Sequence, residues 1–364
     1  MKSKFVLMES LFCLLLGAAC TSTRPSLPPP QEGPSAIVQD YEVQIFFTDN
    51  DMNLVSDLRL GKFVNDTPGI LTVAGDGYRV LSLQGKIMRL MRFDGIAAPD
   101  WADSGKVVDL NGDGIPEFAM HNNGGALLYD WEGHYIWGIH TGFWTHPFGA
   151  DLDGQGQDQI IVAENAHGVT VYSPKGKRLR SLTSRYCSNL RVLNEHDGKS
   201  PKFAVQLMAH NPAGWDIEVL DKNGNRLQEW HPDFPFYEFG SVTQPPLNTG
   251  VLCFQRDNQF IIKDLTGKTV ETLEAPNAKS LPIVISCVHG RDGEPTVVLA
   301  SSRGSQHLFG VYVYGHDSKL IYSYQGRDNA ESLLVLRDSQ ADGALSFLVG
   351  SRNKVLKFIA KPLR

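Results

Sequence analysis

A phrase of eleven residues recurs along the chain, and its spacing limits the possible folds more than any other feature. Each copy has an alternating apolar and polar segment, a tight turn that usually contains glycine, and a second alternating segment. Such alternation around a turn predicts a β-hairpin. The copies are VLSLQGKIMRL (80–90), LLYDWEGHYIW (127–137), VTVYSPKGKRL (169–179), IEVLDKNGNRL (217–227), FIIKDLTGKTV (260–270) and VYVYGHDSKLI (311–321).

The period of this phrase matches one four-stranded sheet. The turns fall at positions 85, 133, 176, 224, 267 and 318, with separations of 48, 43, 48, 43 and 51 residues. A propeller blade takes about 40–50 residues, so the period predicts blades of a β-propeller. Residues 41–361 divided over seven blades give about 46 residues each. A pair of β-sandwiches is the alternative, and six or eight blades stay open because 231–260 is irregular.

The two ends of the repeat region complement each other. The last blade has three candidate strands, Glu331–Arg337, Ala344–Ser351 and Lys354–Ala360, and lacks a fourth. The segment YEVQIFF (41–47) is an alternating strand without a hairpin partner. Pairing it beside 354–360 closes the ring and covers two open edges. We therefore expect an all-β domain over 41–364, a seven-bladed propeller of four-stranded antiparallel blades closed by its N-terminal strand.

Charge and composition exclude several classes of protein. The chain has 34 Lys and Arg against 40 Asp and Glu, a formal net charge of −6, and 42% hydrophobic residues. These values argue against a basic nucleic-acid binder and against a polytopic membrane protein. We expect no nucleic-acid partner.

The first residues have the pattern of an export signal. Lys2 and Lys4 precede the apolar stretch 11–16, and small residues at 17–19 lead directly to Cys20. This pattern predicts a signal peptide over 1–19. The segment LLLGAAC (14–20) resembles the lipobox of bacterial lipoproteins, which implies that Cys20 is lipidated and becomes the new N-terminus. An ordinary cleaved signal with an incidental cysteine is the alternative.

A tether is expected between this anchor and the propeller. Residues 20–40 contain five prolines among Ser, Thr and Gly, a composition that cannot bury a core and favours extended polyproline geometry. Thr21 is not the aspartate that retains lipoproteins at the inner membrane in the sorting rule of Gram-negative bacteria. The resemblance therefore implies a lipid-anchored protein of the bacterial cell envelope, at the outer membrane, with periplasmic or surface exposure left open.

Three cysteines remain in the predicted propeller. Cys187, Cys253 and Cys287 each lie in an apolar, strand-like segment. Buried free cysteine is common, although an oxidising compartment permits one disulfide among the three. We expect structural thiols.

One loop carries specific metal-binding chemistry. In DLNGDGIPE (109–117), oxygen-bearing side chains occupy positions 1, 3, 5 and 9, and a glycine at position 6 permits a sharp turn. This is the first part of an EF-hand-type calcium loop. Here strands flank the loop, so it resembles the calcium loops of FG-GAP and VCBS repeats in integrin-alpha-like propellers. The resemblance implies a structural Ca²⁺ held by Asp109, Asn111, Asp113, the Ile115 carbonyl and Glu117; a polar hairpin without metal is the alternative.

A second loop one blade later has a weaker form of the same pattern. DLDGQGQDQ (151–159) offers Asp151, Asp153 and Gln155, with Gln155 and Gln159 in place of acidic ligands. Asp158 adds a third carboxylate only if it turns toward this loop. We expect weaker calcium binding here.

Aromatic and histidine residues suggest a binding surface. His140, Trp144 and His146 lie between two predicted blades, where rings can stack on a sugar or contact a protein. Strand tryptophans that fill the space between blades are the alternative. A second aromatic region includes Trp215, Trp230 and the 231–246 segment.

These features predict a binding function more strongly than catalysis. The chain has no G-x-S-x-G, H-E-x-x-H or phosphate-binding glycine motif. The leading hypothesis is a calcium-stabilised interaction platform for a protein or a polysaccharide. The alternative is a carbohydrate-active enzyme, since calcium-dependent polysaccharide lyases have similar propellers; a His, Asp, Glu and Arg cluster on the propeller axis would favour it. Proteins related to quinone-dependent dehydrogenases and to the barrel-assembly lipoprotein rank lower, because their repeat-end tryptophan occurs only at Trp137 and Trp230.

Overall fold

The computed structural model describes most of the chain from Tyr41 to Ala360. The described residues are 33–34, 41–52, 54–95, 105–122, 125–140, 145–164, 167–193, 201–208, 215–236, 238–241, 250–281, 283–288, 295–302, 307–315, 317–337 and 345–360. The chain divides into two units, Met1–Gln31 and Glu32–Arg364, and all described residues belong to the second. The predicted signal peptide, Cys20 and most of the 20–40 tether lie outside the described residues.

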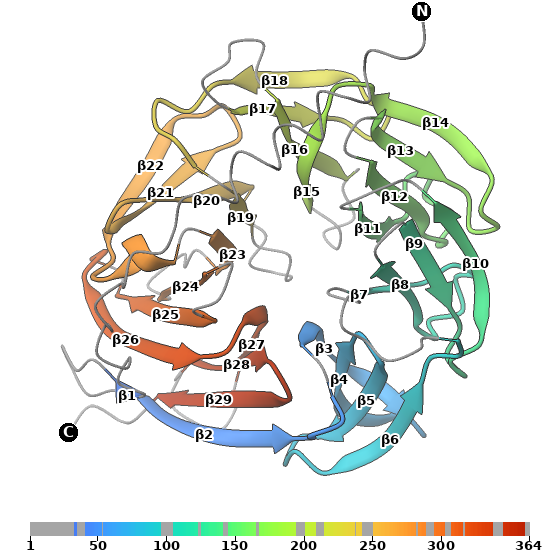
Figure 1. The fold of residues 1–364 in the computed structure, drawn as a ribbon, viewed down its shortest axis with the longest axis horizontal. Coiled ribbons are helices and arrows are strands. Elements are labelled where there is room, and N and C mark those ends of the chain that lie inside the picture. The colour runs from blue at the N-terminus through green and yellow to red at the C-terminus, as the bar shows by residue number, and fades with distance from the viewer. Residues whose placement is uncertain are drawn as a thin grey trace, which may run out of the picture. The chain divides into compact units, whose positions relative to one another are not determined.

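Seven antiparallel sheets, each with four propeller strands, form a ring (Figure 1). This confirms the predicted all-β, seven-bladed propeller. Blade 1 contains β3 (Val55–Val64), β4 (Thr67–Ala74), β5 (Gly77–Ser82) and β6 (Ile87–Arg92). Blade 2 contains β7 (Gly105–Val108), β8 (Glu117–Asn122), β9 (Gly125–Tyr129) and β10 (Tyr135–His140). Blade 3 contains β11 (Thr145–Ala150), β12 (Gln159–Glu164), β13 (Gly168–Tyr172) and β14 (Arg178–Thr183).

The remaining blades repeat this order from the inner to the outer strand. Blade 4 contains β15 (Cys187–Leu193), β16 (Lys202–Met208), β17 (Trp215–Leu220) and β18 (Arg226–Trp230). Blade 5 contains β19 (Phe239–Ser241), β20 (Val251–Arg256), β21 (Gln259–Asp264) and β22 (Thr269–Glu274). Blade 6 contains β23 (Ile283–Val288), β24 (Thr296–Ser301), β25 (Leu308–Tyr314) and β26 (Leu320–Arg327). Blade 7 contains β27 (Ala330–Arg337), β28 (Leu345–Ser351), β29 (Lys354–Ala360) and β2 (Tyr41–Thr48).

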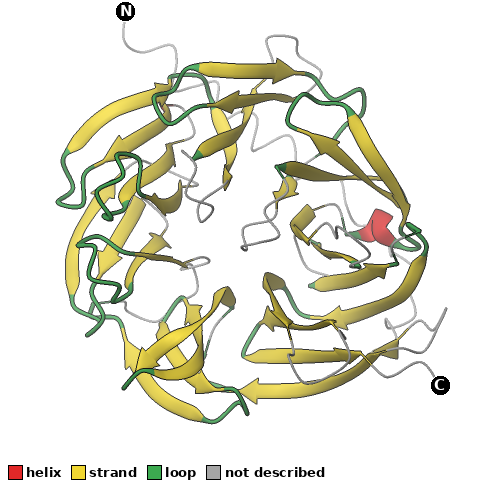
Figure 2. Ribbon diagram, turned by 180° about the vertical axis from the view of Figure 1, so that it is seen from behind, coloured by secondary structure: helices red, strands yellow, loops and turns green. Residues whose placement is uncertain are grey.

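Two short elements complete the description. The two-residue strand β1 (Gly33–Pro34) lies within the predicted tether and pairs with the outer edge of β26. A 3-10 turn, η2 (Ala278–Ser280), lies between β22 and β23 and is red in Figure 2. No helix among the described residues has the length and apolar character needed to cross a membrane.

The first described propeller strand closes the last blade. β2 pairs with β29 in the register Val43↔Phe358 and Ile45↔Leu356. This confirms the predicted closure. A buried ion pair then fixes the chain as it enters blade 1: the guanidinium of Arg79 on β5 lies 2.9 Å from Asp49 and 2.7 Å from Asp76.

The core of the propeller lies between its blades. Seven clusters of buried hydrophobic residues fill the seven interfaces between neighbouring blades. Trp137 contributes to one of them, because its ring covers Gly176 in the turn of the next blade and its Nε1–H donates to the Pro174 carbonyl at 2.8 Å. The ring of Trp230 likewise covers Gly267. These tryptophans fill the space between blades, as the structural alternative predicted.

The strand order gives the propeller two distinct faces. Neighbouring strands are antiparallel, so first-to-second and third-to-fourth connections leave a blade on one face, and all other connections leave on the opposite face. We call the first the turn face; it carries loops 109–117 and 151–159 and the glycine turns. We call the second the crossover face; it carries the links between blades. Figure 2 shows the described connections in green at the strand ends.

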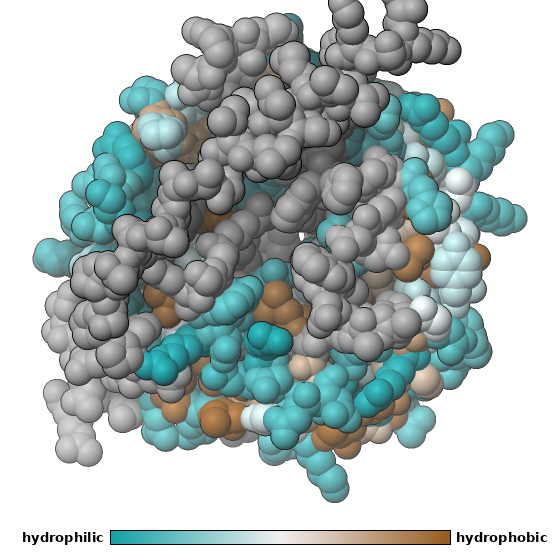
Figure 3. Space-filling view, viewed as in Figure 1, coloured by the Kyte–Doolittle hydropathy of each residue, from teal (hydrophilic) through white to brown (hydrophobic). Residues whose placement is uncertain are grey.

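Figure 3 shows the surface from the side of Figure 1. Among the coloured atoms, hydrophilic residues predominate and hydrophobic residues are scattered between them. Isolated apolar side chains of this kind are normal on a protein surface. A binding region must therefore be identified from its particular residues.

Candidate functional site

Loop 109–117 joins β7 to β8 on the turn face, where the sequence predicted it. Gly112 and Gly114 adopt φ angles of 75° and 77°. This left-handed conformation favours glycine, because any other side chain would clash with its own backbone. The two glycines therefore permit the loop to fold back on its acidic side chains.

The acidic side chains of this loop accept hydrogen bonds from its own backbone. Asp109 Oδ1 accepts the Gly112 N–H at 2.7 Å, and Oδ2 accepts the Gly114 N–H at 3.0 Å. Asp113 Oδ1 accepts the Ile115 N–H at 2.7 Å. These contacts show that the carboxylates shape the turn, a role that does not require a metal.

Glu117 lies at the buried base of the loop. Its Oε2 accepts the Leu110 N–H at 2.7 Å, and its Oε1 accepts a hydrogen bond from Asn111 Nδ2 at 3.2 Å. Asn111 Nδ2 also donates to Asp113 Oδ2 at 2.9 Å, so one amide nitrogen bridges two carboxylates. Burial raises the pKa of Glu117 to about 7; the Leu110 hydrogen bond opposes this shift, and the Asp109 and Asp113 carboxylates add to it. Burial and the neighbouring carboxylates thus disfavour the charged form of Glu117.

The second loop, 151–159, joins β11 to β12 and repeats the turn geometry. Asp151 accepts the N–H groups of Gly154, Gln155 and Gly156 at 2.8, 3.1 and 2.8 Å. Leu152 N–H donates to Gln159 Oε1 at 2.7 Å, the counterpart of the Leu110 bond to Glu117. Where the first loop has a buried carboxylate, this loop has a neutral amide.

The two loops are joined to each other across blades 2 and 3. Asp158 Oδ2 accepts the Asp109 N–H at 2.9 Å, and the Asp158 N–H donates to the Asp109 carbonyl at 2.6 Å. Gln157 Nε2 donates to the Asn111 carbonyl at 3.1 Å. Asp158 therefore links its own loop to the first one.

The loop residues suit calcium in their chemistry more than in their present arrangement. Carboxylate, amide and carbonyl oxygens are the donors that calcium prefers. However, Asn111 presents its nitrogen to the two carboxylates. Among the described residues, no three His, Cys, Asp or Glu side chains form a group that could hold a metal ion. Calcium binding at 109–117, and more weakly at Asp151, Asp153 and Gln155, stays a prediction.

The predicted surface at His140, Trp144 and His146 is only partly described. His140 ends β10 on the crossover face and is exposed. Trp144 lies outside the described residues, and only the backbone of His146 is described, in β11. His134 lies on the turn face, 3.2 Å from Asp130, so the histidines between 121 and 146 do not form a single group.

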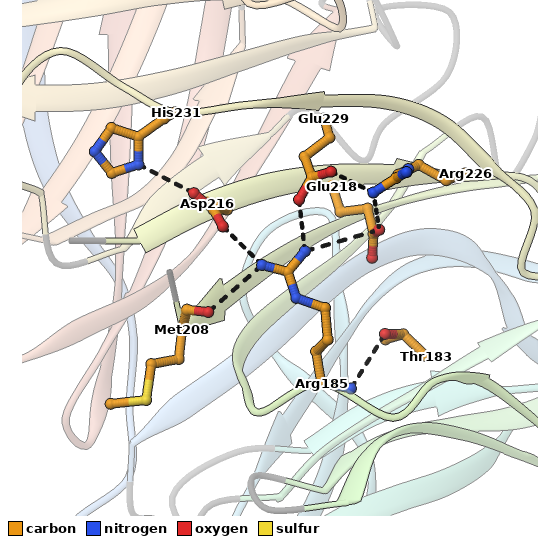
Figure 4. A network of polar contacts seen from close by, with 8 residues as sticks. All are labelled: Thr183, Arg185, Met208, Asp216, Glu218, Arg226, Glu229 and His231. Atoms are coloured by element: carbon orange, nitrogen blue, oxygen red, sulfur yellow. Dashed lines mark hydrogen bonds and ion pairs between the residues drawn. The ribbon is translucent and has the colours of Figure 1, made fainter. Parts of the chain in front are cut away.

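A polar cluster on the crossover face of blade 4 was not predicted (Figure 4). Its centre is Arg185, in the link from β14 to β15. One guanidinium nitrogen lies 2.6 Å from Asp216 on β17, and the other lies 2.6 Å from Glu229 on β18 and 3.9 Å from Glu218. Arg226 also contacts Glu229, and His231 Nδ1 lies 3.1 Å from Asp216. We call these six residues the Arg185 cluster.

The cluster shifts the pKa values of two of its carboxyl groups in opposite directions. Burial alone would raise the pKa of Asp216, but His231 and Arg185 outweigh it and hold the pKa below its usual value. Burial raises the pKa of Glu218, with Arg185 opposing. Burial would lower the pKa of Arg185, but its bonds to Glu229 and Asp216 raise it. Arg185 is therefore the cation on which the cluster depends.

Exposed apolar side chains adjoin the cluster. Tyr186 is 41% exposed and stacks on Trp215, with ring centroids 6.4 Å apart. Met208 is 59% exposed, and its carbonyl accepts a hydrogen bond from Arg185 at 3.5 Å. We call Tyr186, Met208 and Trp215 the apolar patch. Trp215 is among the aromatic residues that the sequence analysis names. Tyr186 and Met208 could not be recognised from the sequence, because they approach Trp215 only in the folded blade.

Comparisons with known proteins support the fold alone. No protein-family model matches the chain, and no curated protein matches it in sequence. The crystal structure of BBS1N in complex with ARL6DN, soaked with lead, matches with a TM-score of 0.55 and 11% identity over 90% of this chain and 97% of that chain. The WD40 domain of Pan2 from Neurospora crassa matches with a TM-score of 0.54 and 11% identity over 90% and 98%. This level of identity carries the propeller architecture and no function.

Proposed function

We propose that this protein is an interaction platform of the bacterial envelope, and that the crossover face of blade 4 binds a protein partner. The observation that carries the proposal is the apolar patch beside the Arg185 cluster. Aromatic residues, Met and Arg are enriched in protein interfaces, usually with polar groups at the rim. One propeller of similar fold, BBS1N, was crystallised in complex with ARL6DN, which is consistent with this use of the architecture.

The test is affinity capture by the mature protein from its own envelope. We expect a single protein to be retained by the wild type and to be lost with Met208→Glu, which puts a charge into the apolar patch. Val270→Glu is the matched control, because Val270 is also exposed but lies on β22 of blade 5. Equal capture by both variants would exclude this face, and retention of a glycan in a parallel screen would replace the protein partner with a polysaccharide.

Calcium is proposed as a stabiliser of loop 109–117. The carboxylates of Asp109, Asp113 and Glu117 would hold it with the Ile115 carbonyl, and Asn111 would join them after its amide turns to present Oδ1. The ion would neutralise the charge around Glu117. Extracellular calcium modules bind with Kd of about 10⁻⁴–10⁻³ M. At 10 mM calcium this affinity corresponds to about 1.5–3 kcal/mol of stabilisation.

Thermal unfolding with and without calcium tests the site. We expect calcium to raise the Tm of the wild type and to have no effect on Asp109→Ala combined with Asp113→Ala. Asp221→Ala is the control, because Asp221 also accepts backbone N–H groups in a tight turn but lacks the ligand spacing. If calcium leaves the wild-type Tm unchanged, the site does not exist.

The FG-GAP and VCBS resemblance and the lipid anchor belong to the same proposal. The loop spacing at 109–117 supports the first, and the segment ending in Cys20 supports the second. We expect Cys20→Ser to release the protein from the membrane fraction, which would show that the cysteine carries lipid.

A carbohydrate-active enzyme is the second candidate. Asp216 and Glu218 have pKa values shifted in opposite directions, which is the usual arrangement of an acid and base pair. However, they lie on β17, an outer strand, and not on the strands around the axis (Figure 1). Polysaccharide depolymerisation that is lost with Glu218→Gln would favour the enzyme over the platform.

A further inference from the structure

Two cysteines meet between blades 5 and 6. Cys253 lies on β20 and Cys287 on β23, and both belong to the buried hydrophobic cluster between these blades. Burial and, after it, the neighbouring Cys287 side chain raise the pKa of Cys253. The two sulfur atoms are therefore neighbours, although the residues are 34 positions apart in the chain.

The backbone beside this pair is unusually close. Gly240 on β19 is the register partner of Cys253. A Cβ atom added to Gly240 would lie 3.3 Å from the backbone of Ser286, the residue that precedes Cys287. A disulfide needs Cα atoms about 4.4–6.8 Å apart and side chains that point toward each other. The missing side chain at Gly240 lets the strands approach, which favours a short distance between the Cα atoms. The contact between Cys253 and Cys287 indicates that their side chains point toward each other.

The third cysteine has a different environment. Cys187 lies on β15 in the cluster between blades 3 and 4, and its thiol donates to the Asn189 carbonyl at 3.4 Å. All three cysteines are reduced and buried in this structure. Cys187 is therefore a natural control for chemistry at the other two.

We propose that Cys253 and Cys287 form a disulfide that joins blade 5 to blade 6 when the chain folds in the presence of an oxidising disulfide. The Cys253 thiolate attacks one sulfur of the oxidant R–S–S–R and releases R–S⁻. The Cys287 thiolate then attacks Cys253 Sγ, forms the Sγ–Sγ bond and releases the second R–S⁻. Two thiols lose two protons and two electrons, and the oxidant leaves as two R–SH.

The bond forms while blades 5 and 6 come together, before their interface is closed to solvent. Both residues are buried, so an oxidant cannot reach them in the folded propeller. Burial, and then the contact with Cys287, raises the pKa of Cys253 well above its usual value, which removes the reactive thiolate once the blades have packed. After closure the same burial protects the disulfide from reductants.

Peptide mapping of the full chain tests the bond directly. The protein is unfolded, refolded with oxidised and reduced glutathione, alkylated in denaturant without reduction, and digested. Trypsin cleaves after Arg256 and Lys279, which places the two cysteines on different peptides. We expect these peptides to be linked and Cys187 to be alkylated. Alkylation of both Cys253 and Cys287, or a link from either to Cys187, would overturn the proposal.

A stability measurement provides a second test. We expect the oxidised protein to melt about 5 °C higher than protein refolded with reductant. Cys187→Ala should keep this difference, and Cys253→Ala with Cys287→Ala should abolish it. The same difference in the double variant would show that reductant acts elsewhere and would overturn the proposal. Neither calcium nor the apolar patch takes part in this chemistry, so its outcome is separate from that of the proposed function.

Discussion

Loop 109–117 and the Arg185 cluster both collect carboxylates, but they compensate the charge in different ways. In the loop, nine consecutive residues fold so that Asp109 and Asp113 accept backbone N–H groups of the loop itself. In the cluster, Asp216, Glu218 and Glu229 come from two strands and are held by an arginine from the link between blades. The loop is a local structure, whereas the cluster exists only when blade 4 is assembled.

This difference predicts different consequences when one member is removed. Backbone donors stay in place when a loop carboxylate is lost, and water can reach them at the exposed rim. Loss of the one central cation leaves several partly buried carboxylates facing each other. The cluster should therefore be the more sensitive of the two regions.

The largest effect is expected for Arg185→Met. The variant leaves Asp216 (14% exposed side chain) and Glu218 (7%) without their main counter-charge, so we expect a loss of about 2–3 kcal/mol in the free energy of unfolding, less than for a fully buried pair. Urea denaturation measures it. Arg226→Met is the control, because Arg226 is 56% exposed and should cost less than about 1 kcal/mol. Equal losses for both would show that Arg185 is not the centre of the cluster.

A smaller effect is expected for Asp109→Ala and Asp151→Ala in calcium-free buffer. Each carboxylate accepts two or three backbone N–H groups of its own loop, so each substitution should cost about 1–2 kcal/mol. The two losses in the free energy of unfolding should be similar, although the first loop has the carboxylate of Glu117 where the second has the amide of Gln159. If Asp109→Ala costs nothing without calcium, then the metal and not the hydrogen bonding holds the first loop.

The smallest effect is a pH dependence at Asp216. Its pKa is lowered in the folded state, so its ionised form contributes stability that is fully present above the unfolded pKa, about 4, and is lost as the pH falls through the folded value. Asp216→Asn removes this contribution. We expect the variant to be less stable by about 1 kcal/mol at pH 6, with the difference shrinking below pH 4. A difference that stays constant from pH 6 to pH 3 would contradict ionisation as the cause.

Sequence and structure agree where the information is local or periodic. The hairpin phrase predicted the blades, and the unpaired strand at 41–47 predicted the closing contact with 354–360. The position and turn geometry of loop 109–117 also follow from adjacent residues. Whether this loop binds a metal does not follow from the sequence, because the same Asp-Gly pattern occurs in a hydrogen-bonded turn and in a set of metal ligands.

Contacts between distant segments could not be predicted in this way. Arg185 meets Asp216 and Glu229 only because three strand ends of blade 4 share one face. Cys253 and Cys287 meet only because β19 and β23 approach at Gly240. The sequence leaves open which way Asp158 turns; in the structure it bonds to the preceding loop, since neighbouring blades place the two loops side by side.

The pairing of β2 with β29 has a consequence for biosynthesis. β2 precedes the other propeller strands in the chain and its partner β29 follows them, so the edge of β2 stays open until the rest of the propeller has been made. Contacts this far apart in sequence slow folding, and an open edge invites pairing with other chains. Since Tyr41 and Ala360 are register partners, a circular permutant that places residues 41–48 after residue 360 would make blade 7 a continuous hairpin sequence. Such a permutant should close its ring faster and aggregate less during refolding.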